Sequence, residues 1–183
     1  DGLNYFGYYM NENIDTSLYY NYADGARGEV ICDAAGNIYV GTCTFSPDFP
    51  TTQNSFGPNY HGGQEGIVFK FDPNLSQLLW SGYFGGSNKD AIYSLDIDQN
   101  NEVYIAGGTT SLNIPTTSGV WHPLAPGTDK CNGFVAHIDA AGSNIIASTY
   151  VGSSEYDQVY FVRVDKLRNV YITGQTKAPG NTF

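Results

Sequence analysis

The chain has 183 residues, including 22 glycines and 15 tyrosines, and its 18 acidic and 8 basic residues give a net charge of −10. This negative charge argues against nucleic-acid binding, which requires a basic face, so no nucleic-acid partner is expected. The sequence also holds no apolar run long enough to predict a membrane-spanning helix.

One motif recurs three times along the chain. It consists of an Asp, a short polar turn and an apolar segment centred on a Tyr, and it stands at residues 33–40, 98–105 and 165–172. Two further blocks return in the same order, 66–72 as 133–139 and 83–85 as 150–152. Repetition that keeps its order and spacing predicts a repeat architecture.

Each repeat contains four short apolar segments separated by Gly, Asn, Asp or Pro, a pattern that predicts strands. In the best-preserved repeat these strands are expected near 91–98, 102–110, 133–139 and 145–151. No stretch of useful length has a helical period. Four antiparallel strands in each tandem unit are typical of a β-propeller blade, so the predicted fold is all-β.

The repeats divide the chain into four parts. Residues 1–25 are expected to hold the end of a preceding blade and a tyrosine-rich insertion loop, followed by blade 1 over 26–84, blade 2 over 85–151 and the first half of blade 3 over 152–183. A propeller ring needs about four to eight blades. We therefore expect a partial propeller, either a fragment of a larger one or a unit completed by further copies of itself.

The three cysteines cannot all pair with one another. Cys32 ends the first strand of blade 1 and is interpreted as a small buried apolar residue. Cys43 lies several residues along the neighbouring strand from any position opposite Cys32, so the geometry disfavours a disulfide. Cys131 lies in a loop.

Asp residues end the first and third strands of the repeats, at one rim of the blades. A carboxylate ring would suit calcium, but the repeated position lacks the dense oxygen ligands that calcium needs. An Asp that binds its own turn is the simpler explanation. No metal and no cofactor are expected at these positions, which are Asp33, Asp72, Asp98, Asp139 and Asp165.

Two long loops, 45–65 and 111–132, are predicted at the opposite rim. Loops above about 12–15 residues are usually functional or disordered. The repeated pairs Phe49-Pro50 and Ile114-Pro115 are expected to pin the loops against the blades, and Asp90 and Asp157 to bind the backbone of the short turns between blades. Less regular aromatic and histidine side chains suit a protein or glycan ligand. The predicted ligand-binding residues are Tyr60, His61, Trp121 and His122.

No catalytic residue is predicted. His61, His122 and His137 lack the spacing of a metal site, and His137 is interpreted as a tolerated strand residue. The sequence contains neither a nucleophile elbow nor a phosphate-binding loop. A non-catalytic role is therefore favoured over an enzyme.

The motifs at 33–44, 46–52, 66–72 and 83–90 resemble those of the SBBP family of bacterial β-propeller repeats. The resemblance covers nearly all of residues 26–176. Asn113-Ile114 departs from the Asp-Phe of the family, Gly152-Ser153-Ser154 departs from its Gly-Gly-Ser, and residues 8–25 have no counterpart. The resemblance implies a propeller in a secreted or cell-surface bacterial protein, and it supplies no shared catalytic residues.

Three functional hypotheses follow. The leading one is a non-catalytic extracellular interaction or scaffold module that presents its long loops to a protein or glycan. The second is a structural subunit that assembles with copies of itself into a surface filament or sheath. The third is a secreted polysaccharide-degrading enzyme. Fold alone does not choose among them.

Overall fold

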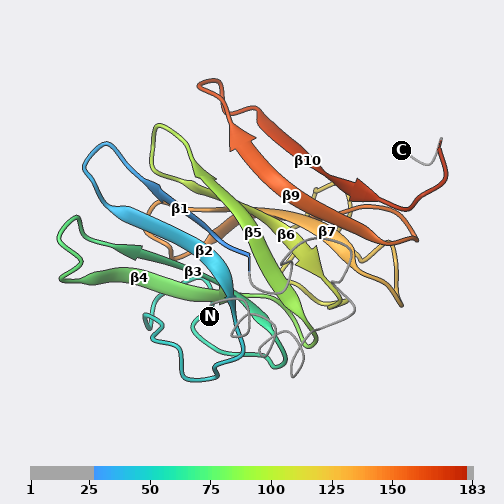
Figure 1. Ribbon diagram of the computed structural model, residues 1–183, viewed down its shortest axis with the longest axis horizontal. Coiled ribbons are helices and arrows are strands. Elements are labelled where there is room, and N and C mark those ends of the chain that lie inside the picture. The colour runs from blue at the N-terminus through green and yellow to red at the C-terminus, as the bar shows by residue number, and fades with distance from the viewer. Residues whose placement is uncertain (1–26, 181–183) are drawn as a thin grey trace, which may run out of the picture.

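A computed structural model describes residues 27–180, which form ten strands and no helix. Three antiparallel sheets follow one another along the chain and do not close into a ring (Figure 1). The all-β prediction is confirmed, whereas the prediction for residues 1–25 lies outside the described residues. Blade 1 contains β1 (Glu29–Cys32), β2 (Ile38–Thr44), β3 (Glu65–Phe71) and β4 (Leu78–Phe84); blade 2 contains β5 (Asp90–Ile97), β6 (Val103–Thr109), β7 (Asn132–Ile138) and β8 (Ile145–Val151); blade 3 contains β9 (Asp157–Val164) and β10 (Val170–Thr176).

The hairpin turns at one rim are closed by the repeated Asp. Oδ1 of Asp33 accepts hydrogen bonds from the backbone N–H groups of Ala35 and Asn37, both at 2.9 Å. Gly36 takes a left-handed conformation within this turn, with φ of 83°. Carboxylates at the equivalent positions also accept bonds from backbone N–H groups of their own turns, which confirms the prediction of Asx turns at Asp33, Asp72, Asp98, Asp139 and Asp165.

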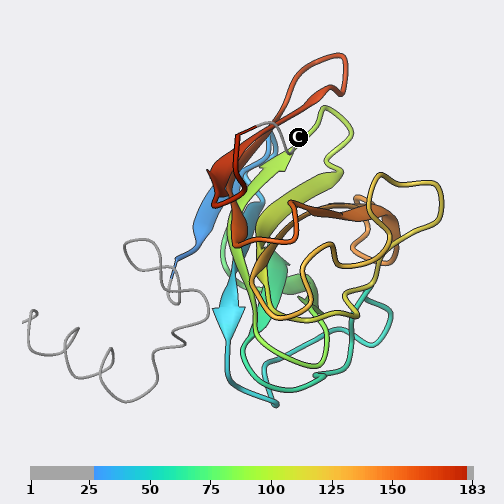
Figure 2. The same cartoon turned by 90° about the vertical axis from the view of Figure 1, so that its right-hand side faces the viewer.

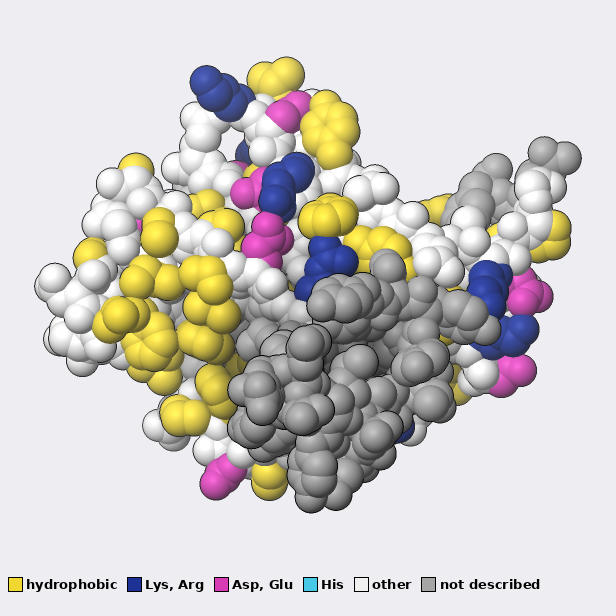
Figure 3. All heavy atoms as spheres, in the orientation of Figure 1, with side chains coloured by type: hydrophobic (Ala, Val, Ile, Leu, Met, Phe, Trp, Pro, Cys, Tyr) yellow, Lys and Arg dark blue, Asp and Glu magenta, His cyan; other side chains and the backbone are white. Residues whose placement is uncertain are grey.

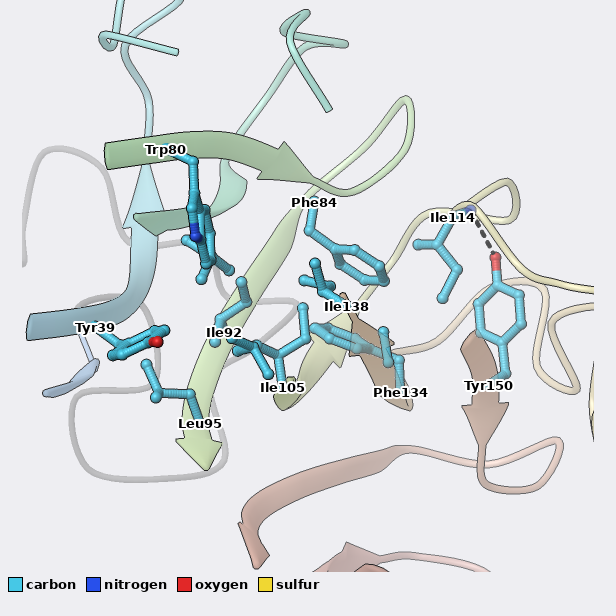
Figure 4. Close-up of a cluster of buried hydrophobic side chains, with 13 residues drawn as sticks. Tyr39, Trp80, Phe84, Ile92, Leu95, Ile105, Ile114, Phe134, Ile138 and Tyr150 are labelled. Carbon is cyan, nitrogen blue, oxygen red and sulfur yellow. Dashed lines mark hydrogen bonds between the residues drawn. The ribbon is translucent and has the colours of Figure 1, made fainter. Parts of the chain in front are cut away.

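The main hydrophobic core lies between blades 1 and 2 (Figure 4). The rings of Phe84 from blade 1 and Phe134 from blade 2 have centroids 4.9 Å apart. Trp80 lies edge-on to Tyr39 at 6.2 Å. Both faces of β6 are buried, because Val103 and Ile105 join this core while Tyr104 joins a second cluster against blade 3. Blade 2 is therefore stabilised by a neighbour on each face, as expected for stacked blades.

The face of blade 1 that points away from blade 2 is open among the described residues. Cys32 is exposed on this face, so the prediction that it is buried is wrong. It shares the face with Val30, which is 62% exposed, whereas Glu29 and Ile31 point towards blade 2. Cys32 and Cys43 are not joined by a disulfide, as expected from their spacing. Figure 3 shows apolar side chains gathered over β1–β4 on the side that faces the viewer.

A polar network joins the first strands of all three blades. The Glu29 carboxylate accepts hydrogen bonds from the Ser94 hydroxyl at 2.6 Å and the Leu95 N–H at 3.0 Å. It also pairs with the Arg163 guanidinium of blade 3 at 2.7 Å. Acidic and basic side chains lie side by side in the middle of the face seen in Figure 3. Blade 1 therefore contacts blade 3 directly, across β5.

The turn between β7 and β8 requires a glycine because Trp80 covers it. Gly142 has φ of 65°, and a Cβ there would lie 2.3 Å from the Trp80 ring. Leu75 holds the same place in the β3–β4 turn with φ of 57°, and its side chain is 63% exposed. A non-glycine residue is thus tolerated in this backbone conformation when nothing covers it.

We expect Gly142→Ala to lower the free energy of unfolding by about 1–3 kcal/mol, since the added methyl group overpacks the seam between blades. The control Leu75→Ala should change it by less than about 0.5 kcal/mol. Urea denaturation followed by circular dichroism measures both values. Equal effects of the two substitutions would show that Trp80 does not press on the turn.

Candidate functional site

Tyrosine hydroxyls anchor the start of each long loop. The Tyr83 hydroxyl donates to the Ser46 carbonyl at 2.8 Å and accepts from the Phe49 N–H at 3.0 Å. In blade 2, the Tyr150 hydroxyl likewise donates to the Ser111 carbonyl at 2.9 Å and accepts from the Ile114 N–H at 3.1 Å. These hydrogen bonds therefore fix the start of each loop to the last strand of its own blade, β4 in blade 1 and β8 in blade 2.

The middle of each loop runs along the outer edge of the same strand. Thr52 N–H donates to the Ser81 carbonyl at 3.0 Å in blade 1, and Thr117 N–H donates to the Ser148 carbonyl at 3.1 Å in blade 2. Ile114 joins the main core, and Phe49 packs on Phe69 with ring centroids 5.4 Å apart. The predicted inward packing of the two X-Pro segments is confirmed. The loops protect the edges of β4 and β8 from pairing with other chains.

Tyr60 and His61 lie together at the end of the first loop. The His61 N–H donates to Glu65 Oε2 at 2.9 Å, and His61 Nδ1 lies 2.7 Å from Oε1 of the same carboxylate. The Tyr60 hydroxyl donates to the Gly63 carbonyl, and burial together with the Glu65 charge raises the pKa of Tyr60. Glu65 is fully buried, whereas the His61 side chain is 51% exposed. His61 thus covers a buried carboxylate and keeps one edge accessible.

A second buried carboxylate, Asp90, lies beside Glu65. Carboxyl atoms of Asp90 and the Cγ of Glu65 would each approach a Cβ on Gly85 within 2.9 Å. Asp90 accepts hydrogen bonds from the Thr109 hydroxyl, the Gly86 N–H and the Ser111 hydroxyl. The pKa of Asp90 is raised to about 6, mainly by burial and to a smaller extent by the neighbouring Glu65 charge, while the three hydrogen bonds act to lower it.

Asp90 and its counterpart Asp157 both hold the short turns between blades. Asp90 Oδ2 accepts from the Gly86 N–H at 2.8 Å, and Asp157 Oδ2 accepts from the Ser153 N–H at 2.6 Å. The predicted backbone role of both residues is confirmed. Asn132 replaces Glu65 next to Asp157, so the carboxylate pair occurs at the seam between blades 1 and 2 and has no counterpart at the second seam.

Trp121 and His122 lie on the second loop, with ring centroids 4.3 Å apart. Thr51 and Thr116 donate to the Pro58 and Pro123 carbonyls at 2.9 Å each, which places Trp121 at the position of Phe56. Phe56 packs against Trp80, whereas Trp121 is 61% exposed. Leu112 and Leu124 are further exposed apolar side chains of this loop, and Leu124 is 76% exposed.

The four predicted ligand-binding residues form two separate pairs. Within residues 27–180, no hydrogen bond, ion pair or ring contact joins Tyr60 and His61 to Trp121 and His122. The same residues contain no group of three or more His, Cys, Asp or Glu side chains arranged to hold a metal ion. The rim therefore offers anchored loops with exposed apolar and aromatic groups, which suits binding by surface contact.

A polar cluster at the opposite rim was not predicted. The His137 ring stacks on Tyr104 at 4.1 Å and lies 2.8 Å from Glu102 through Nε2. Arg168 of blade 3 pairs with Asp98 at 2.9 Å and also contacts Glu102. In blade 1, Asn37 and Lys70 take the places of Glu102 and His137. This paired replacement was visible in the repeats and is the signal that sequence reasoning missed.

Comparison with known families supports the repeat assignment. Residues 148–181 match the model of the SBBP family, described as a beta-propeller repeat. This confirms the resemblance inferred from the motifs. None of the curated proteins compared with the chain is a match. Residues 27–180 include no helix with the length and apolar character needed to cross a membrane.

Proposed function

We propose that this β-propeller repeat protein is a non-catalytic interaction module on the outside of a bacterial cell, and that its two long loops present a binding surface to a protein or glycan. The observation that carries the proposal is the way the loops are held. Both are fixed to the last strand of their blade by equivalent tyrosine hydroxyls, yet they keep large apolar groups in solvent.

Rigid display favours binding because little conformational freedom is lost when a partner docks. Residues 45–64 and 110–131 connect strands whose side chains join the main core between blades 1 and 2, so the scaffold below the loops is stiff. The exposed groups are of the kind that bind protein surfaces and sugar faces, a large aromatic ring and branched aliphatic chains. The extracellular location is inferred from the family resemblance.

The test is a glycan array and a pull-down with the purified chain, followed by titration of any ligand found. We expect the double variant Leu112→Ser/Leu124→Ser to bind that ligand at least tenfold more weakly. Ile146→Ser, which alters an exposed apolar residue on β8 outside the loops, should bind like the wild type. Equal weakening by both variants, or ligand contacts mapped outside the loops, would contradict the proposal.

A second candidate is a subunit that assembles with copies of itself. It is favoured by apolar side chains on the outer faces of the first and last sheets, including Val30 on β1 and Phe161 and Tyr171 on blade 3. Sedimentation velocity distinguishes the two candidates. A chain that remains a monomer at concentrations of about 100 μM excludes assembly through these faces, which would bury far more area than a transient contact.

A further inference from the structure

The far end of each long loop is held by a side chain at the start of the third strand of its blade. Figure 2 shows the first loop, residues 45–64 in cyan to teal, leaving the lower end of β2. Where this loop meets β3, the two carboxylate oxygens of Glu65 accept from the His61 N–H at 2.9 Å and from His61 Nδ1 at 2.7 Å. A carboxylate only accepts, so this contact places a hydrogen on Nδ1.

The second loop is held by a group that does not titrate. Asn132 occupies the place of Glu65 in the strand pairing. Its side-chain oxygen accepts from the Gly127 N–H at 2.9 Å, and its side-chain nitrogen donates to the Gly127 carbonyl at 2.8 Å. The two blades therefore close their loops in equivalent places, one with a neutral amide and the other with an ionisable pair.

Two glycines separate His61 from the strand that follows. Gly62 and Gly63 have φ values of 120° and 69°, which few other residues adopt. Beyond them the chain is fixed again, because the Gln64 carbonyl accepts from the Asp90 N–H at 2.7 Å. The glycines can therefore act as a hinge that moves His61 without disturbing β3.

Behind His61 lies a pair of like charges. Glu65 and Asp90 are both fully buried. A Cβ on Gly85 would lie 2.5 Å from Asp90 Oδ2 and 2.9 Å from Glu65 Cγ, so the two side chains are neighbours. Two buried carboxylates at this separation resist ionising together. A protonated His61 ring supplies a positive charge directly at Glu65 and offsets this repulsion.

We propose that the His61–Glu65 contact is a pH-sensitive latch on the first long loop, closed in mild acid and weakened as the pH rises from about 5 towards neutral. Release swings Tyr60 and His61 outward about the two glycines and admits water to Glu65 and Asp90. The second loop has no such latch. The latch is a property of the chain alone, and only its effect on the loop surface proposed above rests on that function.

Two changes of charge act in the same direction. The pKa of Asp90 is about 6 with the loop closed and 3.8 in its ordinary state, so release lets Asp90 ionise and rising pH favours the open loop. The imidazole of His61 loses its positive charge near neutral pH, which removes the charge that pairs with Glu65. When release restores the ordinary pKa, Asp90 alone raises the ratio of open to closed loops about tenfold between pH 5 and pH 7.5.

Other titratable groups surround the latch. They are Tyr60 and Asp48 on the first loop, Tyr83 on β4, Tyr150 on β8, Lys89 in the turn between the blades, and Cys43 on β2 next to Gln64. The pKa values of the three tyrosines and of the Cys43 thiol are all raised, so these four groups stay uncharged below pH 8. The charge changes that drive the latch are those of Asp90 and His61.

The test is hydrogen exchange of the His61 amide in the full 183-residue chain, followed by NMR from pH 5 to pH 7.5 and corrected for the intrinsic pH dependence of exchange. We expect its protection factor to fall about tenfold. The Gly127 amide is the matched control within the same molecule, and its protection should change less than about twofold because Asn132 does not titrate.

Two variants identify the groups responsible. Asp90→Asn should reduce the pH dependence at His61 to less than about threefold, and Glu65→Gln, which removes the other charge of the pair, should also make it smaller than in the wild type. A measurement on the wild type needs neither variant: the fall in protection should end at the pH where the Asp90 carboxyl, followed by ¹³C NMR, completes its titration.

The inference is overturned if His61 protection is constant or increases with pH. It is also overturned if the His61 and Gly127 amides lose protection equally, because the whole chain and not the first loop would then be opening. An unchanged pH dependence in folded Asp90→Asn would likewise exclude the buried carboxylate pair as its origin.

Discussion

Replacing Phe134 with alanine is expected to lower the free energy of unfolding by about 3–5 kcal/mol, the range found for large aromatic residues removed from protein cores. The Phe134 ring is fully buried between two sheets and packs against Phe84. It also lies against Gly107, where a Cβ would come within 2.9 Å of Cζ. The cavity has little freedom to collapse, because rigid strands form its walls.

Ile146→Ala is the matched control for Phe134→Ala. Ile146 lies in the same blade on β8, and it is exposed, so its truncation should change stability by less than about 0.5 kcal/mol. Urea denaturation followed by circular dichroism and by the fluorescence of buried Trp80 measures both variants. If Phe134→Ala were no more damaging than Ile146→Ala, the seam between blades 1 and 2 would not be the principal core.

The second large effect is a pH dependence of stability that originates at Asp90. Its pKa is about 6 in the folded chain against an ordinary value of 3.8. Between these two values the unfolded chain ionises Asp90 while the folded chain keeps it protonated. The free energy of unfolding therefore falls as pH rises from about 4 to about 6, by about 3 kcal/mol at about 1.4 kcal/mol per pKa unit.

Asp90→Asn isolates this contribution, because an amide does not titrate. Groups with lowered pKa values, such as Glu29 and Asp33, favour the folded chain as pH rises, so the wild-type profile is a sum of opposing effects. The difference in stability between wild type and variant should therefore shift in favour of the variant by about 3 kcal/mol between pH 4 and pH 7. Urea denaturation at several pH values gives this difference, and a constant value would show that Asp90 does not titrate as described.

The architecture was predictable because each local signal repeats. Three signals recur with one spacing: the Asp turns, the Tyr of the second strand and the glycine-bounded strands. Each of them arises within a single blade. Features that depend on contacts between blades were harder to predict from the sequence. Phe56 and Trp121 follow a shared Pro-Thr-Thr motif at the same spacing. The sequence does not reveal that Phe56 packs against Trp80 whereas Trp121 is exposed.

Burial was the other feature that sequence reasoning misjudged. Cys32 and Ile97 hold the same position in their strands, and the pattern predicts the same environment for both. Ile97 is partly covered by blade 1, whereas the face that carries Cys32 has no neighbour among the described residues. Burial in a stacked fold depends on the next unit along, which the residues of one repeat do not reveal.

The hydrogen bonds and the ion pair of Glu29 affect the cooperativity with which the three sheets unfold. Tandem repeats usually behave as a row of units in which each responds to its nearest neighbours alone. Here one carboxylate of the first unit binds Leu95 of the second and Arg163 of the third. Melting of the third sheet would therefore be felt by the first through this carboxylate as well as through the second sheet.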